Sequence, residues 1–379
     1  MTLSTRLRRV TTPAGDPAWL VTTYHDVKQL LNDPRLGRSH PDPERAPRYA
    51  DAAIFGGPIG SPETEQAEHA QMRALLTRSF SARRMDLLRP RIQDLVDGLI
   101  DDLLQRVPPA DFHAAVSFPL PVLVICQLLG VPFEDHQRFR QWSDDAADMT
   151  DANRSRAGLA QLFGYMLELL SRKRQQPAED VISDLLAAQA INPALTDQGI
   201  AQLSAGLLFA GHETTVAAID KGVVLLTANA MRREALRADP GLIASTVEEI
   251  LRYPDPVRPV DIEEPGGLPR YAHADIELDG VTIKAGDLVL LALREANVDA
   301  DIFPRPDEFD IRRADNPHLA FGHGSRYCIG APLARIELQT VLATLMRRVP
   351  TLHLAVPIDQ LRPKRHLLTG GLVELPVTW

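Results

Sequence analysis

Cys328 is the residue whose setting most directly implies chemistry. It lies in the glycine-rich run 321–330, FGHGSRYCIG, just before residues that read as the start of a helix. A helix N-terminus favours the anionic form of a thiol through its dipole and its free backbone N–H groups. Gly322, Gly324 and Gly330 leave room for a large flat group to approach the backbone. A lone thiolate beneath a planar macrocycle is the haem-thiolate arrangement, which favours cleavage of an O–O bond.

The same run resembles the haem-binding loop of the cytochrome P-450 superfamily, whose pattern is Phe-Gly-x-Gly-x-(His/Arg)-x-Cys-x-Gly. Each fixed position matches, from Phe321 through Arg326 and Cys328 to Gly330. The resemblance implies haem b (iron protoporphyrin IX) as the cofactor. Cys328 would be the ligand of its iron, and Phe321, Arg326 and Gly330 would bind the cofactor beside it. The alternative interpretation is a structural cysteine buried beside a glycine turn.

A second motif, AGHETT at residues 210–215, lies inside the longest unbroken helical pattern, 196–229. A helix of ~30 residues would be about 45 Å long, enough to cross a domain. Polar residues beside a glycine are unfavourable in mid-helix, although threonine hydroxyls can bond the preceding turn and an acid can be solvated. The motif resembles the family's oxygen-side helix. By that resemblance Gly211 opens space above the haem, Thr214 holds dioxygen and water in a hydrogen-bond chain, and Glu213 relays the protons that O–O cleavage requires.

Haem also carries two propionates, which need cations or strong hydrogen-bond donors. His69 and Arg73 are four residues apart, on one helical face, and resemble the family's His-x-x-x-Arg propionate clamp. That clamp normally follows Asp-Pro-Pro-Glu, whereas residues 65–68 are EQAE, so only the last acid and the histidine match. The resemblance adds Arg270 and Arg326, whose guanidinium groups can bind a carboxylate in two places. For each of the four residues, a surface salt bridge is the alternative.

Glu249 and Arg252 form an acid–base pair at helical spacing. The spacing alone is a weak signal, because residues 234–237 also match it. The Tyr253 that follows resembles the family's Glu-x-x-Arg helix, which implies a buried structural pair. Arg313, in an irregular region, is the expected third member. Burying such charges requires that they be paired.

Composition limits the class of protein. The chain has 379 residues, 45% hydrophobic and 24% charged, a net charge of −9 and two cysteines. This composition is typical of a globular protein. The negative net charge does not favour nucleic-acid binding, and two cysteines are too few for a disulfide framework. The apolar stretch 118–133, which contains Cys126, is broken by prolines and is too short to cross a membrane. We find no secretory signal at the N-terminus and expect a cytoplasmic monomer.

Helical and strand patterns occupy different parts of the chain. The helix-rich parts are about 65–254 and 331–347, and the strand-rich parts are about 18–22 and 270–293. Asp279-Gly280 predicts a hairpin turn between two short strands. The cysteine loop and the long helix must face each other, so both parts should share one core. We predict a single, mostly α-helical α+β domain over residues 1–379 with the cytochrome P-450 fold, in which the long helix lies over the haem.

The resemblance implies a haem-thiolate monooxygenase that inserts one atom of dioxygen into a C–H bond by hydroxylation or epoxidation. The chain's last residues, 372–379, and the run 317–321 look most like actinobacterial enzymes that tailor macrolides and related natural products. We therefore expect a medium-to-large apolar natural product as substrate. Loop 41–62 and the weakly patterned region 153–176 would cover its pocket. An oxidative-coupling enzyme would use the same core.

Electrons would come from NAD(P)H only indirectly, through a ferredoxin reductase and a ferredoxin. We expect the ferredoxin to dock on the cysteine side, where arginines could gather into a positive patch. These arginines are Arg73, Arg78, Arg83, Arg84, Arg326 and Arg335. The alternatives are a haem peroxygenase, a haem sensor or carrier, and a haem-free helical binding protein. Glu213 and Thr214 favour the dioxygen route, because a peroxygenase needs no such relay.

Overall fold

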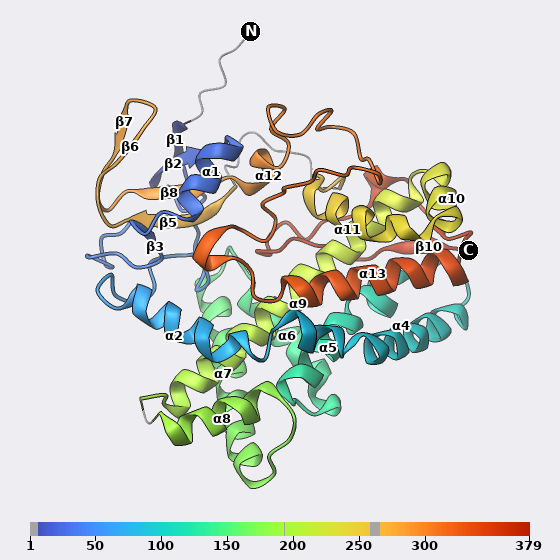
Figure 1. Ribbon diagram of the computed structural model, residues 1–379, viewed down its shortest axis with the longest axis horizontal. Helices are drawn as coiled ribbons and strands as arrows, with labels where there is room; N and C mark the ends of the chain where they lie inside the picture. Colours follow the sequence, from blue (N-terminus) through green and yellow to red (C-terminus); the bar gives the residue numbers. More distant parts are fainter. Residues whose placement is uncertain (1–6, 193, 258–265) are drawn as a thin grey trace.

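The computed structural model describes residues 7–192, 194–257 and 266–379. Helices form most of this part of the chain, and most of the strands gather at one end, beside α1 (Figure 1). The helices are α1 (Tyr24–Leu31), α2 (Glu65–Thr77), α3 (Ala82–Asp86), α4 (Arg89–Leu104), α5 (Pro119–Leu129), α6 (His136–Ala146), α7 (Ala152–Gln175), α8 (Val181–Ile191), α9 (Asp197–Thr227), α10 (Ala230–Ala238), α11 (Ile243–Arg252), α12 (Leu293–Ala296) and α13 (Ala331–Arg348). The strands are β1 (Leu7–Thr11), β2 (Pro17–Val21), β3 (Leu36–Gly37), β4 (Ala110–Asp111), β5 (Leu268–Ala272), β6 (Ile276–Leu278), β7 (Val281–Ile283), β8 (Leu288–Leu291), β9 (His353–Leu354) and β10 (Pro376–Thr378).

The long helix α9 runs for 31 residues through the middle of the molecule (Figure 1). Thr196 caps it, because its side chain accepts a hydrogen bond from the backbone N–H of Gly199. α5, α7 and α13 pack along α9, so apolar residues such as Ile200, Leu208 and Val216 are buried. α9 therefore spans the helical body and can present residues to its interior.

The strands form three sheets. The largest has the order β1-β2-β8-β5-β3, a second has the order β4-β10-β9, and β6 and β7 make a two-stranded hairpin. Asp279 and Gly280 join β6 to β7 with φ angles of 52° and 75°. Positive φ at both positions is the geometry of a type I′ turn, as the Asp-Gly pair predicts.

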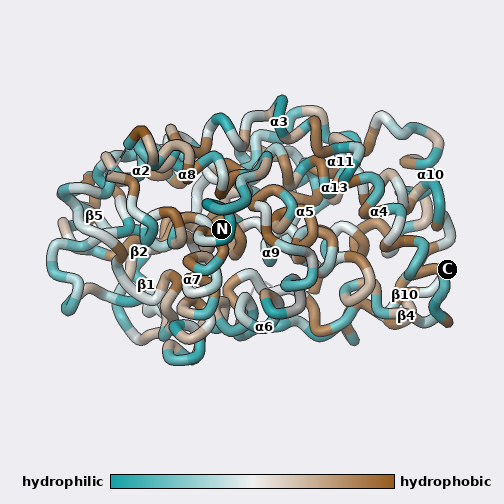
Figure 2. Tube along the Cα trace, turned by 90° about the horizontal axis from the view of Figure 1, so that it is seen from below, coloured by the Kyte–Doolittle hydropathy of each residue, from teal (hydrophilic) through white to brown (hydrophobic). Residues whose placement is uncertain are grey.

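Apolar segments concentrate toward the interior, and polar segments lie mainly at the periphery (Figure 2). One large core joins the helices to β4 and β10. The five-stranded sheet instead builds two smaller clusters, one around Tyr24 and Phe303 and the other around Leu20 and Tyr271. The five-stranded sheet thus packs its buried residues in clusters distinct from the large helical core. The single domain over residues 1–379 stays a prediction.

The two segments expected to cover a substrate pocket differ in structure. Region 153–176 folds as the regular helix α7, whose buried residues include Leu162, Tyr165, Met166 and Leu169 at helical spacing. Loop 41–60 contains no helix or strand. Within the described residues, none of the helices combines the length and apolar character that a membrane crossing requires.

Candidate active site

The cysteine loop leads directly into α13. Its backbone is closed by a hydrogen bond of 2.9 Å from the N–H of Cys328 to the carbonyl of Phe321. Gly322 and Gly324 have φ angles of 73° and 71°, the left-handed region that side chains disfavour. A β-carbon at Gly324 would also collide with Asn32. At Gly330 it would lie 3.9 Å from the sulfur of Cys328, so this glycine keeps the space beside the sulfur open.

Cys328 is exposed at the start of α13, with the surrounding protein close enough to desolvate its thiol in part. Burial raises the pKa of the Cys328 thiol, although the backbone N–H groups of Gly330 and Ala331 and the charges of Arg73 and Arg335 act in the opposite direction. The helix terminus therefore lowers the pKa of the thiol, as expected, but its effect is smaller than that of burial. A metal cation would supply the remaining stabilisation, because coordination deprotonates a thiol.

Among the described residues, no group of three or more His, Cys, Asp or Glu side chains could hold a metal ion. The resemblance of the cysteine loop implies a metal carried by a macrocycle, to which a single cysteine is the protein's ligand.

One side of α9 is uncovered. Gly206, Ala210 and Thr214, each four residues apart, are exposed, while Leu208 and Thr215 between and beside them are buried. These three residues form the open stripe of α9. Because α13 packs against α9, the loop that opens α13 and the stripe belong to the same part of the molecule (Figure 1).

The two predicted relay residues, Glu213 and Thr214, lie on different faces of α9. Thr214 lies on the open stripe, and its hydroxyl donates a hydrogen bond of 2.9 Å to the carbonyl of Ala210. Glu213 is buried, with one carboxylate oxygen 3.4 Å from Nδ1 of His212. The His212 ring in turn meets Phe118 edge-on, with 4.6 Å between the ring centroids. Thr214 can therefore reach a bound group, while Glu213 lies behind it.

Gly211 lies at a close contact between two helices, and its expected role beside the haem stays a prediction. A β-carbon at this position would lie 3.0 Å from Cδ1 of Ile125 on α5. Gly211 therefore allows α5 and α9 to pack closely, and it is Ala210 and Thr214 that border the open space. The motif alone could not distinguish these neighbouring faces of one helix, because they are separated by a rotation of about 100°.

The four residues predicted to bind propionates come together from three elements. His69 and Arg73 lie on α2, Arg270 on β5, and Arg326 in the cysteine loop. Burial lowers the pKa of His69, and the charges of Arg326, Arg73 and Arg270 lower it further, against the effect of Glu65. Arg73 also donates a hydrogen bond of 3.0 Å to the carbonyl of Tyr327, next to Cys328.

Two further residues of this cluster were missed in the sequence. Arg38 follows β3, and Glu65 begins α2. Burial lowers the pKa of Arg270 to about 9, and the nearby charges of Arg38 and Arg326 contribute, while Glu65 opposes them. No motif identifies Arg38. Glu65 could have been found, because it occupies the place of the aspartate in the family's Asp-Pro-Pro-Glu-His pattern, one carbon longer.

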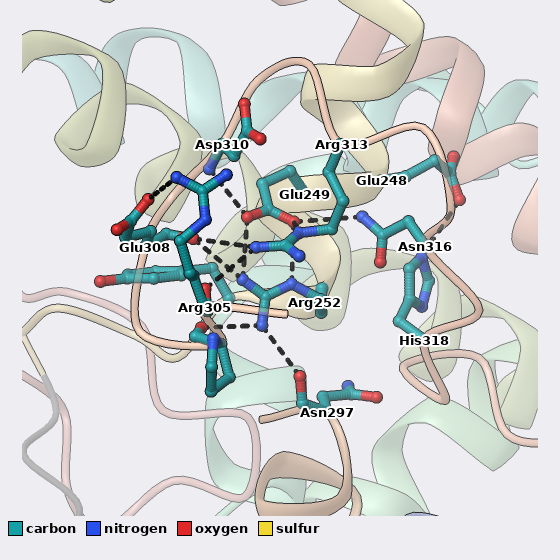
Figure 3. Close-up of polar contacts among 12 residues, drawn as sticks. Glu248, Glu249, Arg252, Asn297, Arg305, Glu308, Asp310, Arg313, Asn316 and His318 are labelled. Carbon is teal, nitrogen blue, oxygen red and sulfur yellow. Dashed lines mark hydrogen bonds and ion pairs between the residues drawn. The ribbon is translucent and has the colours of Figure 1, made fainter. Parts of the chain in front are cut away.

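The buried pair on α11 is the centre of a dense network (Figure 3). Arg252 binds Glu249 through two hydrogen bonds, each 2.8 Å. Arg313 donates to the same carboxylate at 3.1 Å, and the backbone N–H of Asp310 donates at 2.9 Å. The remaining guanidinium N–H groups of Arg252 reach the carbonyls of residues 297, 306 and 308. The network thus fixes the irregular chain that leads to the cysteine loop.

The neighbouring Glu248 connects this network to the loop itself. Its carboxylate accepts hydrogen bonds of 2.7 and 2.8 Å from Arg335 of α13 and is 3.1 Å from the ring of His318. Burial opposes ionisation, but the hydrogen bonds from Arg335 and His318 lower the pKa of Glu248 to about 2. The Arg335 guanidinium lies 4.6 Å from the ring centroid of Phe321. In this structure Phe321 therefore also anchors the loop to α13.

Known proteins resemble the chain over nearly its whole length. The family model for Cytochrome P450 matches residues 151–368. Pentalenolactone synthase of Streptomyces exfoliatus is 45% identical over 374 residues, which are 97% of this chain and 91% of that protein. The chain belongs to the cytochrome P450 family.

Other relatives of this P450 support the same family assignment. The mycinamicin IV hydroxylase/epoxidase of Micromonospora griseorubida is 40% identical over 374 residues, 98% of this chain and 92% of that protein. The LnmA cytochrome P450 hydroxylase of Streptomyces atroolivaceus, a solved structure, superposes with a TM-score of 0.87 at 36% identity, covering 99% and 94% of the two chains. These matches confirm the predicted family and fold. Because the relatives are hydroxylases, epoxidases and monooxygenases, this P450 is an enzyme of the monooxygenase class.

The residues present fit the haem that the family implies. Arg38, Arg270 and Arg326 act on one another electrostatically, and Glu65 is the carboxylate that acts on all three. Three guanidinium charges against one carboxylate leave a surplus that suits two propionates. Cys328 supplies the thiolate, and the open stripe of α9 offers a surface free of bulky side chains.

Several of the arginines expected to form a positive patch on the cysteine side are paired with carboxylates. Arg326 pairs with Glu65 and Arg335 with Glu248, and Arg84 binds Asp184 at 2.6 Å. Within the described part of the chain, Arg78 and Arg83 are exposed and make no ion pair. Arg83 lies on α3, which packs against α13, so the charge that remains available lies on the cysteine side.

Proposed function

We propose that this P450 is a haem-thiolate monooxygenase that hydroxylates or epoxidises an apolar natural product. The observation that carries the proposal is the placement of one accessible cysteine at the start of α13, with surplus arginines on one side and the open stripe of α9 in the same part of the fold. When bound, haem supplies the activation of dioxygen, and the protein supplies orientation, protons and exclusion of water.

The chain's own residues have distinct tasks in this scheme. Cys328 donates its thiolate charge from one side, and Thr214 presents a hydroxyl from the other. That hydroxyl donates its proton to the Ala210 carbonyl, so its oxygen can accept a hydrogen bond from a bound water, and the O–H can instead turn toward a bound oxygen when it leaves Ala210. Glu213 and His212 are a proton donor pair behind it. One oxygen atom enters the substrate and the other leaves as water, with two protons and two electrons consumed.

We propose a medium-to-large apolar substrate. The open stripe carries no charge. α7 packs against α9, and a corner formed by residues 147–149 and 366–368 precedes α7. The corner is held by hydrogen bonds of 2.9 Å from Met149 to His366 and from Leu368 to Ala147, all between backbone groups. Loop 41–62 is attached to α7 through a hydrogen bond of 3.1 Å from Ala53 to Ser155. A relative, the mycinamicin IV hydroxylase/epoxidase, acts by its name on mycinamicin IV, and we propose a substrate of the same general kind.

Electrons reach the enzyme from NAD(P)H through a ferredoxin reductase and a ferredoxin in our proposal. Arg78 and Arg83, with the exposed Leu87 beside them, give the docking face positive charge around an apolar residue. We expect the enzyme to work in the cytoplasm as a monomer. Haem b is the expected form of the cofactor, because the chain holds it by ionic contacts and a thiolate.

The test is turnover with isotope-labelled dioxygen. The reconstituted enzyme, with ferredoxin, reductase and NADPH, is supplied with substrates chosen by spectral-shift screening. We expect one labelled atom in each product molecule and the other in water. A product that takes no label from dioxygen, and takes it only when labelled hydrogen peroxide is supplied instead, would support a peroxygenase. Absence of any substrate-dependent NADPH consumption would favour a haem sensor or carrier.

A further inference from the structure

A buried carboxylate lies inside the arginine cluster on the haem side. Glu65, the first residue of α2, is 8% exposed. Its oxygens accept hydrogen bonds from the backbone N–H groups of Arg38 (2.8 and 3.0 Å) and Ser39 (2.9 Å). They also accept from the Ser39 hydroxyl and the Arg326 guanidinium. The ring of His273 is 3.8 Å away.

These contacts make Glu65 a junction of three segments: α2, the chain after β3, and the cysteine loop. The close approach depends on Gly37, because a β-carbon there would collide with the carboxylate of Glu65 and with the ring of His273. The backbone at residues 37–39 and the side chain of Arg326 both contact this carboxylate closely. Such a built site implies that the position of the carboxylate matters.

Glu65 is charged although it is buried. Burial opposes its ionisation, but hydrogen bonds from the Ser39 side chain and from the backbone of Arg38 and Ser39 outweigh burial and lower its pKa. Its charge acts on three arginines of the cluster, since it offsets the mutual repulsion of Arg38, Arg270 and Arg326. It holds Arg326 through the side chain and Arg38 through the backbone.

We propose that Glu65 is a positioning residue for the haem propionates and lowers the reduction potential of the bound haem. It orients Arg326 and the segment of Arg38 so that their guanidinium groups receive the propionates. Its fixed negative charge, close to the propionates, favours the oxidised, more positive state of the iron centre. This inference rests on the proposed haem-thiolate function.

The test compares Glu65→Gln with Glu68→Gln in the holoenzyme. Glu68 lies on the same helix, is exposed, and makes no ion pair among the residues described. Both substitutions remove one negative charge from α2. We measure transfer of haem to an excess of a haem-scavenging protein, followed by absorbance, and the reduction potential by spectroscopic redox titration.

Glu65→Gln should release haem about tenfold faster, the effect of losing one charge-assisted hydrogen bond, and its potential should become more positive. Glu68→Gln should leave both quantities near the wild-type values. Equal effects of the two substitutions, or none in either, would overturn the inference. If the wild type itself binds no thiolate-ligated haem, the proposed function fails, and that outcome is separate from a failed comparison of variants.

Ser39→Ala provides a second test that does not depend on the folding of Glu65→Gln. It removes one donor to the carboxylate and keeps the charge. The less neutralised charge should move the potential in the negative direction, opposite to Glu65→Gln. An unchanged or more positive potential in Ser39→Ala would contradict a role for the Glu65 charge.

Discussion

Thr214 reaches the open stripe of α9, and its neighbour Thr215 does not. Thr214 is exposed and bonds the carbonyl of Ala210, whereas Thr215 is buried with its hydroxyl 3.5 Å from the carbonyl of Gly211. The two hydroxyls are therefore a matched pair, alike in chemistry and different in access. Only the first of them can take part in a hydrogen-bond chain to a group bound in the open space.

Thr214→Ala should uncouple electron use from product formation. Without the hydroxyl, protons are no longer delivered at the right atom, so we expect about tenfold less product per NADPH while NADPH consumption continues. The measurement is product and hydrogen peroxide yield per NADPH consumed. Thr215→Ala is the control and should keep nearly all of the coupling. A Thr214→Ala enzyme as well coupled as the wild type would remove Thr214 from the relay.

At the scale of elements, α11 holds the irregular chain 304–316 in place for the cysteine loop. Its pair is completely buried: the side chains of Glu249 and Arg252 are both 0% exposed. The matching spacing at Glu234 and Arg237 on α10 is exposed. The same sequence pattern thus makes a structural centre in one helix and a solvated surface in the other, and only the packing of the chain around it decides which.

Arg252→Gln should lower the free energy of unfolding by about 3–5 kcal/mol, because it leaves the buried Glu249 carboxylate with only part of its partners. Arg237→Gln, at the equivalent place of the exposed pair, should change it by about 0.5 kcal/mol or less. Urea denaturation of the purified proteins measures both. Similar losses in the two variants would show that burial of the Glu249 pair is not what makes it important.

At the scale of the whole molecule, local signals in the sequence were sufficient for the family and the fold, and they proposed most residues of the candidate site. The cysteine loop, the Thr196 cap and the Asp279-Gly280 turn are each determined within a few residues, so the sequence reveals them directly. The ion pair of Glu65 with Arg326, and the closeness of Arg38 to both, could not be predicted, because the chain brings them together from distant segments.

Two features of the site depend on packing that the sequence does not contain. The role of Gly211 depends on which face of α9 meets Ile125, a matter of packing between helices. The thiol of Cys328 combines two opposing effects, since burial raises its pKa and the helix N-terminus lowers it, and spacing does not give their balance. A bound iron would decide that balance, so the thiolate is a property of the assembled enzyme.

The central claim is that Cys328 binds haem iron as a thiolate. The direct measurement is the absorption spectrum of the reduced, carbon-monoxide-treated protein, compared between the wild type, Cys328→Ser and Cys126→Ser. Cys126 is buried on α5, and burial raises the pKa of its thiol to about 12, so it serves as the matched control. We expect the strongly red-shifted Soret band of thiolate-ligated haem in the wild type and in Cys126→Ser, and its loss in Cys328→Ser. A wild type without that band, or a Cys328→Ser protein that keeps it, would contradict the account.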